Sequence, residues 1–262
     1  MFQAYNTVSS AASAPLAIPA QAPAARRTAS APAVSLTGAR QNALLQALPD
    51  ADLERLFAHM ELVPLKAGQR LYDFGDQLEY SYFPTNAIIS LQYISEEGAT
   101  TEIAVVGREG VAGVAMYRGE RASNTAMVTG AGYGYRLRAE ALRGMFAEGG
   151  MLADQLMRYT SSMFAQLAQN VVSSRHASID QKLCRWLLER LDRSLGTELK
   201  ATQENIANLL GVRRESITAS AAKLQAEGAI QCRRGVIDVL DRAILESNAG
   251  GCYFTPRLAH MM

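Results

Sequence analysis

Cysteine and long apolar runs are both scarce in this 262-residue sequence, and each scarcity excludes a class of protein. The three cysteines, Cys184, Cys232 and Cys252, are odd in number and lack the paired spacing of metal ligands, which favours reduced thiols in a cytoplasmic protein. No stretch of about 18 apolar residues occurs, so no membrane-spanning helix is expected. The formal net charge is only +1, so any affinity for nucleic acid must come from a local basic patch.

The first 38 residues lack acidic side chains and any periodic apolar stripe. Alanine, serine and proline dominate this segment, and such a composition cannot bury enough apolar surface to offset the entropy of ordering the chain. Residues 1–38 are therefore predicted to be a disordered tail. Prolines interrupt the segment and Arg26–Arg27 come late in it, which argues against a secretory signal. Residues 246–262 are interpreted as a second, C-terminal tail.

Residues 39–148 change from helical to strand-like patterning. The segment NALLQALPDADLERLFAHM predicts one or two short helices, with a helix start at Pro49–Asp50. Short β-rich runs such as ELVPLK and TTEIAVVG then alternate with Gly, Pro, Asn and Asp turn signals. Antiparallel strands at these intervals favour a barrel or roll.

Residues 149–175 predict one long helix with two neighbouring apolar stripes. One stripe holds Leu152, Leu156, Tyr159 and Met163, and the adjacent one holds Met157, Phe164, Leu167 and Val171. Together they are broad enough to bury one edge on the chain's own β-rich half and to offer the other to a second copy. A parallel two-helix dimer seam is therefore predicted, with a helix packed only on its own domain as the alternative. The side chains assigned to the dimer helix are Leu152, Leu156, Tyr159, Met163 and Leu167.

A small polar hinge is predicted at residues 173–177, after the long helix. Ser178 and Gln181 then have the spacing of a capping box, which predicts the start of another helix. A hinge at this point is where a signal could change the spacing of two DNA-binding elements.

Residues 202–230 predict two short helices joined by a tight turn. Thr202 is a suitable N-cap, and Gly211 can adopt the positive φ that a sharp turn requires. Ala207, Gly211 and Ile217 stand where a DNA-binding helix-turn-helix needs a small residue, a turn residue and an apolar anchor. Residues 230–240 alternate like a β-hairpin with a basic tip, so the whole segment predicts a winged helix.

Residues 176–245 resemble the winged-helix domain of the Crp/Fnr family of bacterial transcription regulators, through TQENIANLLGVRRESIT, KLQAEGAI and the RRG wing turn. The resemblance implies that Arg214 and Glu215 read bases. Ala219 departs from the family pattern because the best-known members carry a second base-reading arginine there, which implies a different operator sequence. Arg213 is a second departure, because members of the family usually have a small N-capping residue at this position. The side chains assigned to phosphates or neighbouring bases are Gln203, Arg213, Ser216, Thr218, Lys223, Arg233 and Arg234.

The order of short strands, long helix and winged helix extends the resemblance to about residues 40–245, and implies a cyclic-nucleotide-binding-like β-roll. Family pockets that bind a cyclic nucleotide use a Gly-Glu-x-Gly loop and an Arg-Ser/Thr-Ala segment, whose arginine pairs with the phosphate. Glu109 and Gly110 resemble the first part, but Asn124, followed by Thr125, stands in place of the arginine. Unless Arg121 or Arg118 substitutes for it, the phosphate lacks a charged partner, so cyclic AMP is not expected to bind tightly.

Two other family cofactors are also not expected. Iron–sulfur members carry clustered cysteines near the N-terminus, whereas the first cysteine here is Cys184. Haem requires axial ligands in the sensor, and His59 is the only histidine of that half.

The sequence therefore predicts an α+β protein with an N-terminal antiparallel β-roll sensor (residues 39–148), a long dimerisation helix and hinge (149–175) and a C-terminal winged helix-turn-helix (176–245). The predicted function is that of a cytoplasmic homodimer that regulates transcription on a near-palindromic operator in double-stranded DNA. The resemblance implies RNA polymerase as a further partner. No nucleophile–base constellation or phosphate-binding glycine loop indicates an enzyme. The alternative is a ligand-binding signalling protein whose winged helix mediates protein–protein contact.

Overall fold

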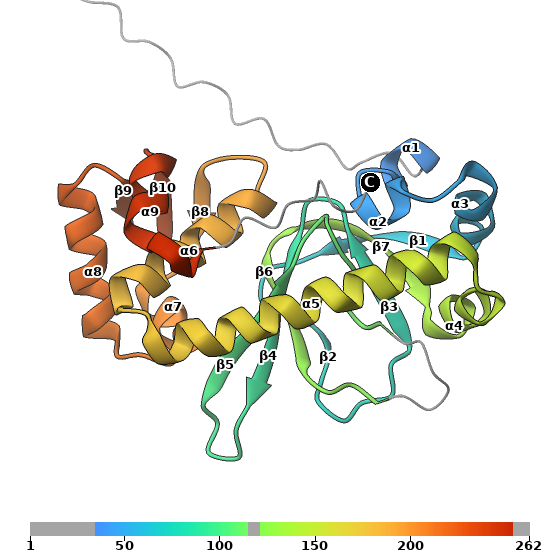
Figure 1. Cartoon of the computed structure of the whole chain (residues 1–262), viewed down its shortest axis with the longest axis horizontal. Helices are drawn as coiled ribbons and strands as arrows, with labels where there is room; N and C mark the ends of the chain where they lie inside the picture. Colours follow the sequence, from blue (N-terminus) through green and yellow to red (C-terminus); the bar gives the residue numbers. More distant parts are fainter. Residues whose placement is uncertain (1–34, 115–120, 254–262) are drawn as a thin grey trace, which may run out of the picture. The chain divides into compact units, whose positions relative to one another are not determined.

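Two antiparallel sheets form the N-terminal half of the computed structural model, which describes residues 35–114 and 121–253 (Figure 1). One sheet has the strand order β1-β7-β3 and the other β2-β6-β4-β5. Together they are the predicted β-roll, and with the helices around them they confirm the α+β class. The strands are β1 (Met60–Leu65), β2 (Arg70–Tyr72), β3 (Tyr80–Pro84), β4 (Ile88–Ile94), β5 (Thr100–Val106), β6 (Thr125–Gly130) and β7 (Gly132–Arg138).

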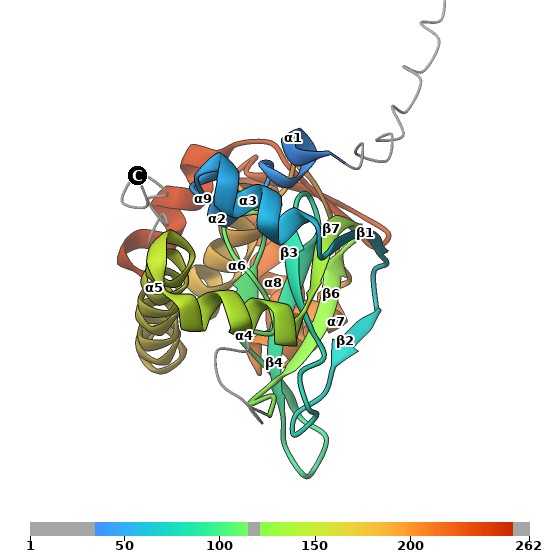
Figure 2. The ribbon, with the colours of Figure 1, turned by 90° about the vertical axis from the view of Figure 1, so that its right-hand side faces the viewer.

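Helices close one side of this half. The short helices α1 (Leu36–Ala39), α2 (Ala43–Gln46) and α3 (Asp50–Phe57) lie beside β1 and β7 (Figure 2). They share a core with α4 (Ala139–Glu148) and with the first turns of α5 (Gly150–His176). Phe83 and Tyr135 are fully buried in that core.

The C-terminal half contains a third sheet and four helices. Its elements are α6 (Ile179–Arg193), β8 (Glu198–Lys200), α7 (Gln203–Leu210), α8 (Arg214–Ala226), β9 (Ile230–Arg233), β10 (Val236–Val239), α9 (Arg242–Ala249) and a 3-10 turn (Gly250–Cys252). The predicted hairpin is β9–β10, and β8 adds a third strand in the order β8-β10-β9. The predicted capping box is present, because Gln181 N donates to Ser178 Oγ and Ser178 N donates to Gln181 Oε1.

Three predicted boundaries differ from the structure. Helix α1 begins at Leu36, inside the predicted N-terminal tail, because Ser35 caps it by accepting from Gly38 N at 3.0 Å. Helix α9 extends into the predicted C-terminal tail because Ala249 is buried in the core of that half. The predicted hinge over residues 173–177 is shorter, because α5 continues to His176 and only Ala177 leaves the helix. Residues 1–34 and 254–262 of the two predicted tails lie outside the described residues.

Helix α5 is the longest helix of the described residues, but it is not apolar enough for a membrane. Across these residues, none of the helices has both the length and the apolar character that a bilayer crossing needs.

Candidate nucleic-acid interface

The helix-turn-helix forms from local signals that the sequence contains. Thr202 caps α7 by accepting from Asn205 N at 3.1 Å. Gly211 ends α7 in the left-handed region, with φ 64° and ψ 37°, where a side chain would be strained. Ala207 and Ile217 are buried between the two helices, so the predicted small residue, turn residue and anchor all lie where a helix-turn-helix needs them.

The first turn of α8 presents charged side chains to solvent. Arg213, Arg214 and Glu215 are all exposed, and none of their side chains forms a hydrogen bond or ion pair with another described residue. Arg213 occupies the N-cap position without a side-chain cap, in agreement with the departure noted in the sequence. Two arginines at the positive end of a helix are thus available for an external anion or a base edge.

Gln203 and Thr218 contact each other across the two helices. Thr218 Oγ1 lies 2.7 Å from Gln203 Oε1, and it also lies 3.1 Å from the carbonyl oxygen of Arg214. Its single proton can serve only one of these acceptors at a time. This contact holds the first turn of α7 against α8, so both side chains support the position of α8 as well as lying near the predicted DNA surface.

Lys223 also has a partner within the chain. Its ammonium lies 2.8 Å from the carboxylate of Asp180, in the first turn of α6. The hydrogen bond from Lys223 lowers the pKa of Asp180, and the same bond raises the pKa of Lys223. Because the pair is exposed, its effect on stability is small. Lys223 therefore ties α8 to α6, in addition to its predicted contact with phosphate.

The two arginines of the wing differ in their surroundings. Arg233 lies 2.6 Å from Asp238 and 3.4 Å from Glu198, and the hydrogen bond to Asp238 raises its pKa. Arg234, in the β9–β10 turn, is exposed and has no such partner among the described residues. The net positive charge of the wing tip therefore comes mainly from Arg234.

The predicted effector residues are occupied by contacts within the protein. Glu109 is paired with Arg193 of α6 at 2.6 Å and also accepts from Gly107 N, so Oε1 of its carboxylate is engaged within the protein. Asn124 Oδ1 lies 3.5 Å from the Tyr72 hydroxyl, whose pKa is raised by burial. Residues 115–120, between these two parts of the predicted pocket, lie outside the described residues.

Two further members of the predicted pocket also have partners. Arg121 donates to the carbonyl of Gly75 at 2.8 Å, and Thr125 Oγ1 lies 3.2 Å from Asp73. Gly110 is buried against Tyr159, and a Cβ at Gly110 would lie 2.3 Å from the tyrosine ring. Arg193, the partner of Glu109, was missed by sequence reasoning because nothing local distinguishes it from the other charged residues of α6.

The five side chains assigned to the dimer helix pack on the chain's own β-roll, which corrects the prediction. They are buried or half-buried in the two cores of that half and comprise Leu152, Leu156, Tyr159 and Met163 of the first stripe and Leu167 of the adjacent one. The exposed residues belong instead to the neighbouring stripe, where Met157 is 50% exposed, Phe164 74% and Val171 66%. The first stripe packs mainly into the core that α5 shares with β3, β7 and the short helices, and α5 also contacts β5.

Comparisons with known proteins agree with this geometry. Residues 181–247 match the sequence profile of the Crp-like helix-turn-helix domain. No curated protein matches the sequence of the chain. A solved structure from Eubacterium rectale, described as a transcriptional regulator of the Crp/Fnr family, is similar with a TM-score of 0.63 at 21% identity, over 80% of this chain and 99% of that one.

Two further solved structures are similar over comparable lengths. FixK2 from Bradyrhizobium japonicum has a TM-score of 0.63 at 14% identity, over 73% of this chain and 98% of that one. The c-di-GMP responsive global regulator CLP from Xanthomonas campestris has a TM-score of 0.59 at 15% identity, over 74% of this chain and 100% of that one. The C-terminal domain is thus a Crp-like helix-turn-helix domain, and the chain has the fold of Crp/Fnr regulators.

Proposed function

We propose that this chain, with its Crp-like helix-turn-helix domain on the fold of Crp/Fnr regulators, is a transcription regulator that binds a near-palindromic DNA operator as a homodimer. The observation that carries the proposal is the first turn of α8, where Arg213, Arg214 and Glu215 are exposed and unpaired among the described residues. Arginine can donate two hydrogen bonds to guanine O6 and N7, and glutamate can accept one from cytosine N4.

The exposed stripe of α5 supports the homodimer. Met157, Phe164 and Val171 recur at intervals of seven residues, which is the repeat of a two-helix coiled coil. A two-fold pairing through this stripe would place two recognition helices on one face. Their half-sites would then lie about one DNA turn, ~34 Å, apart.

Selection of bound duplexes from a random pool, followed by sequencing, tests the proposal. A near-palindromic consensus is expected, with an affinity that falls steeply as salt increases, because lysines and arginines release counterions from phosphates. The alternative, a signalling protein whose winged helix binds another protein, predicts no DNA binding even at low salt.

Arg234→Ala is expected to weaken binding to DNA of any sequence and to reduce the slope of log affinity against log salt by about 1 for each protomer, or about 2 for the proposed dimer. The reason is that Arg234 is the unpaired cation of the wing tip. Filter binding or fluorescence anisotropy at several salt concentrations measures the slope. Arg70→Ala removes the same charge from the sensor and is the control, so equal slopes for the two variants would contradict the assignment.

Cyclic AMP is proposed not to be the effector. Asn124 stands in place of the phosphate-binding arginine, and Glu109 is engaged by Arg193. A calorimetric titration is expected to give no heat of binding at micromolar cyclic AMP. Affinity in the micromolar range or tighter would show that another cation, such as Arg121, replaces the missing arginine.

A further inference from the structure

Two buried ion pairs join the sensor to α6 of the DNA-binding domain. Arg190 donates to Glu102 of β5 at 2.6 Å, and Arg193 donates to Glu109, in the turn after β5, at 2.6 Å. Each arginine side chain is 4% exposed, whereas Glu102 is 8% exposed and Glu109 16%. Burial lowers the pKa of Arg193, but the carboxylates of Glu109 and Glu189 outweigh this, so its pKa is raised and it stays charged. We call Glu102–Arg190 and Glu109–Arg193 the docking pairs.

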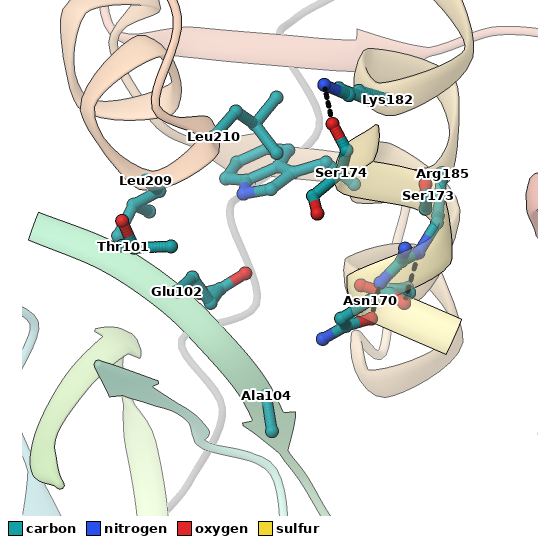
Figure 3. Close-up of a pocket in the computed structure, with 12 residues that line it drawn as sticks. Thr101, Glu102, Ala104, Asn170, Ser173, Ser174, Lys182, Arg185, Leu209 and Leu210 are labelled. Atoms are coloured by element: carbon teal, nitrogen blue, oxygen red, sulfur yellow. Dashed lines mark hydrogen bonds and ion pairs between the residues drawn. The ribbon is translucent and has the colours of Figure 1, made fainter. Parts of the chain in front are cut away.

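Helix α5 joins the same interface through Asn170. Its side-chain amide donates to the carbonyl of Ile103 in β5 at 2.5 Å, and its oxygen accepts from Arg185 of α6. Arg185 is also paired with Glu189 at 2.9 Å. Figure 3 shows Asn170 and Arg185 together with Glu102 and Ala104 of β5. Asn170 therefore contacts both a sensor strand and the first helix of the DNA-binding domain.

The turn after β5 fits closely between two helices. A Cβ on Gly107 would lie 2.7 Å from Cγ of Arg193, and Gly110 packs against the ring of Tyr159 of α5. The Tyr159 hydroxyl donates to the carbonyl of Val111 at 3.0 Å. This turn of the sensor thus contacts both α5, which carries the exposed stripe, and α6.

We propose that the four residues of the docking pairs are positioning residues, which hold the DNA-binding domain in one orientation on the sensor. Removing two charges from water costs free energy. The attraction between the charges offsets this cost only when the geometry is good, so a buried ion pair contributes little to net stability. Charge-assisted hydrogen bonds are directional, however, and each requires its partner at one place. The docking pairs therefore favour this docked arrangement over alternatives that would leave a charge buried and unpaired.

The inference rests on the proposed function, because a dimer that binds two half-sites needs a fixed distance between its recognition helices. In the docked arrangement, the first turn of α8 remains exposed. Docking therefore favours operator binding and does not block it. In a dimer with loosened docking, the two DNA-binding domains move relative to the sensors. Binding both half-sites then costs the entropy of fixing their orientation, so the affinity for the complete operator falls.

Trp186 provides an internal reporter of docking. It is the only tryptophan of the sequence and is 3% exposed. It lines a cavity of about 80 Å³ together with Thr101 and Glu102 of β5, and the guanidinium of Arg190 lies 3.6 Å from its ring centroid. If β5 separates from α6, water reaches the indole ring.

The first measurement is tryptophan fluorescence of the full-length protein and of Glu102→Gln, Glu109→Gln and the double variant. Glutamine keeps the shape and one acceptor oxygen of each glutamate, but it removes the negative charge and replaces the second oxygen with an amide donor. The expected result is emission at longer wavelength and stronger quenching by acrylamide in the double variant, with far-UV circular dichroism unchanged. If the double variant fails to fold, Glu109→Gln, at the more exposed pair, gives the comparison. Glu61→Gln is the control, because it removes an exposed ion pair with Arg136 inside the sensor.

The second measurement compares the selected palindrome with a single half-site. The double variant is expected to lose affinity for the palindrome on the order of tenfold, and to bind the half-site as the unaltered protein does. Unchanged fluorescence, equal losses on both DNAs, or tighter binding to the palindrome would each overturn the proposal. If the unaltered protein binds no DNA, the proposed function fails, and with it the positioning role in operator binding. The fluorescence result still decides whether the docking pairs hold the two halves together.

Discussion

Arg214→Ala is expected to reduce the affinity of the proposed homodimer for the selected operator by at least about 30-fold, because each of the two half-sites loses one bidentate base contact of ~1–3 kcal/mol. Arg214 is exposed in the first turn of α8 and has no side-chain partner among the described residues, so its loss disturbs no interaction of the folded chain. Competition between the selected operator and unrelated duplex DNA measures the effect. The affinity for unrelated DNA is expected to change far less than the affinity for the operator.

Arg213→Ala is the matched control for this experiment. It removes the same charge one residue earlier, at the N-cap of α8, where a phosphate contact is predicted. It is expected to weaken binding to both DNAs by a similar factor. If Arg214→Ala kept the full preference for the operator, the assignment of α8 as the recognition helix would be wrong.

The helix-turn-helix could be predicted from the sequence because its determinants are close together in the chain. Thr202, Gly211 and Ile217 lie within sixteen residues, and a cap, a left-handed turn and an apolar anchor each leave a local pattern. The capping box of Ser178 is local in the same way. Strand β8 was missed because it is three residues long and pairs with β10, far along the chain. Such a strand has too few residues for an alternating pattern.

The β-roll half contains contacts that could not be predicted from the sequence. Glu109 matches part of a ligand-binding motif, but its partner Arg193 is 84 residues away, and no local pattern connects the two. Which of the two stripes of α5 is buried also depends on tertiary packing. Both stripes have helical spacing, and only the packing of the turn after β5 and of the neighbouring core against α5 decides that Tyr159 is buried and Phe164 is not. Periodicity predicts that a helix has an apolar face, but not which neighbour covers it.

Phe164→Glu is expected to convert the proposed homodimer into a monomer. Phe164 is 74% exposed at the centre of the Met157–Val171 stripe, so a two-fold seam would bury it once from each chain. Losing two buried phenylalanines removes at least ~3 kcal/mol, more than about 100-fold in the dimer dissociation constant, and the two carboxylates would also repel each other. Analytical ultracentrifugation measures the molecular mass, and the affinity for the palindrome should fall when the dimer is lost.

Gln169→Glu is the control. Gln169 is exposed on a different face of α5, so this substitution adds the same charge and should leave the dimer intact. A dimer that survives Phe164→Glu would show that the two chains associate through another surface. If the unaltered protein is a monomer, α5 packs only on its own chain.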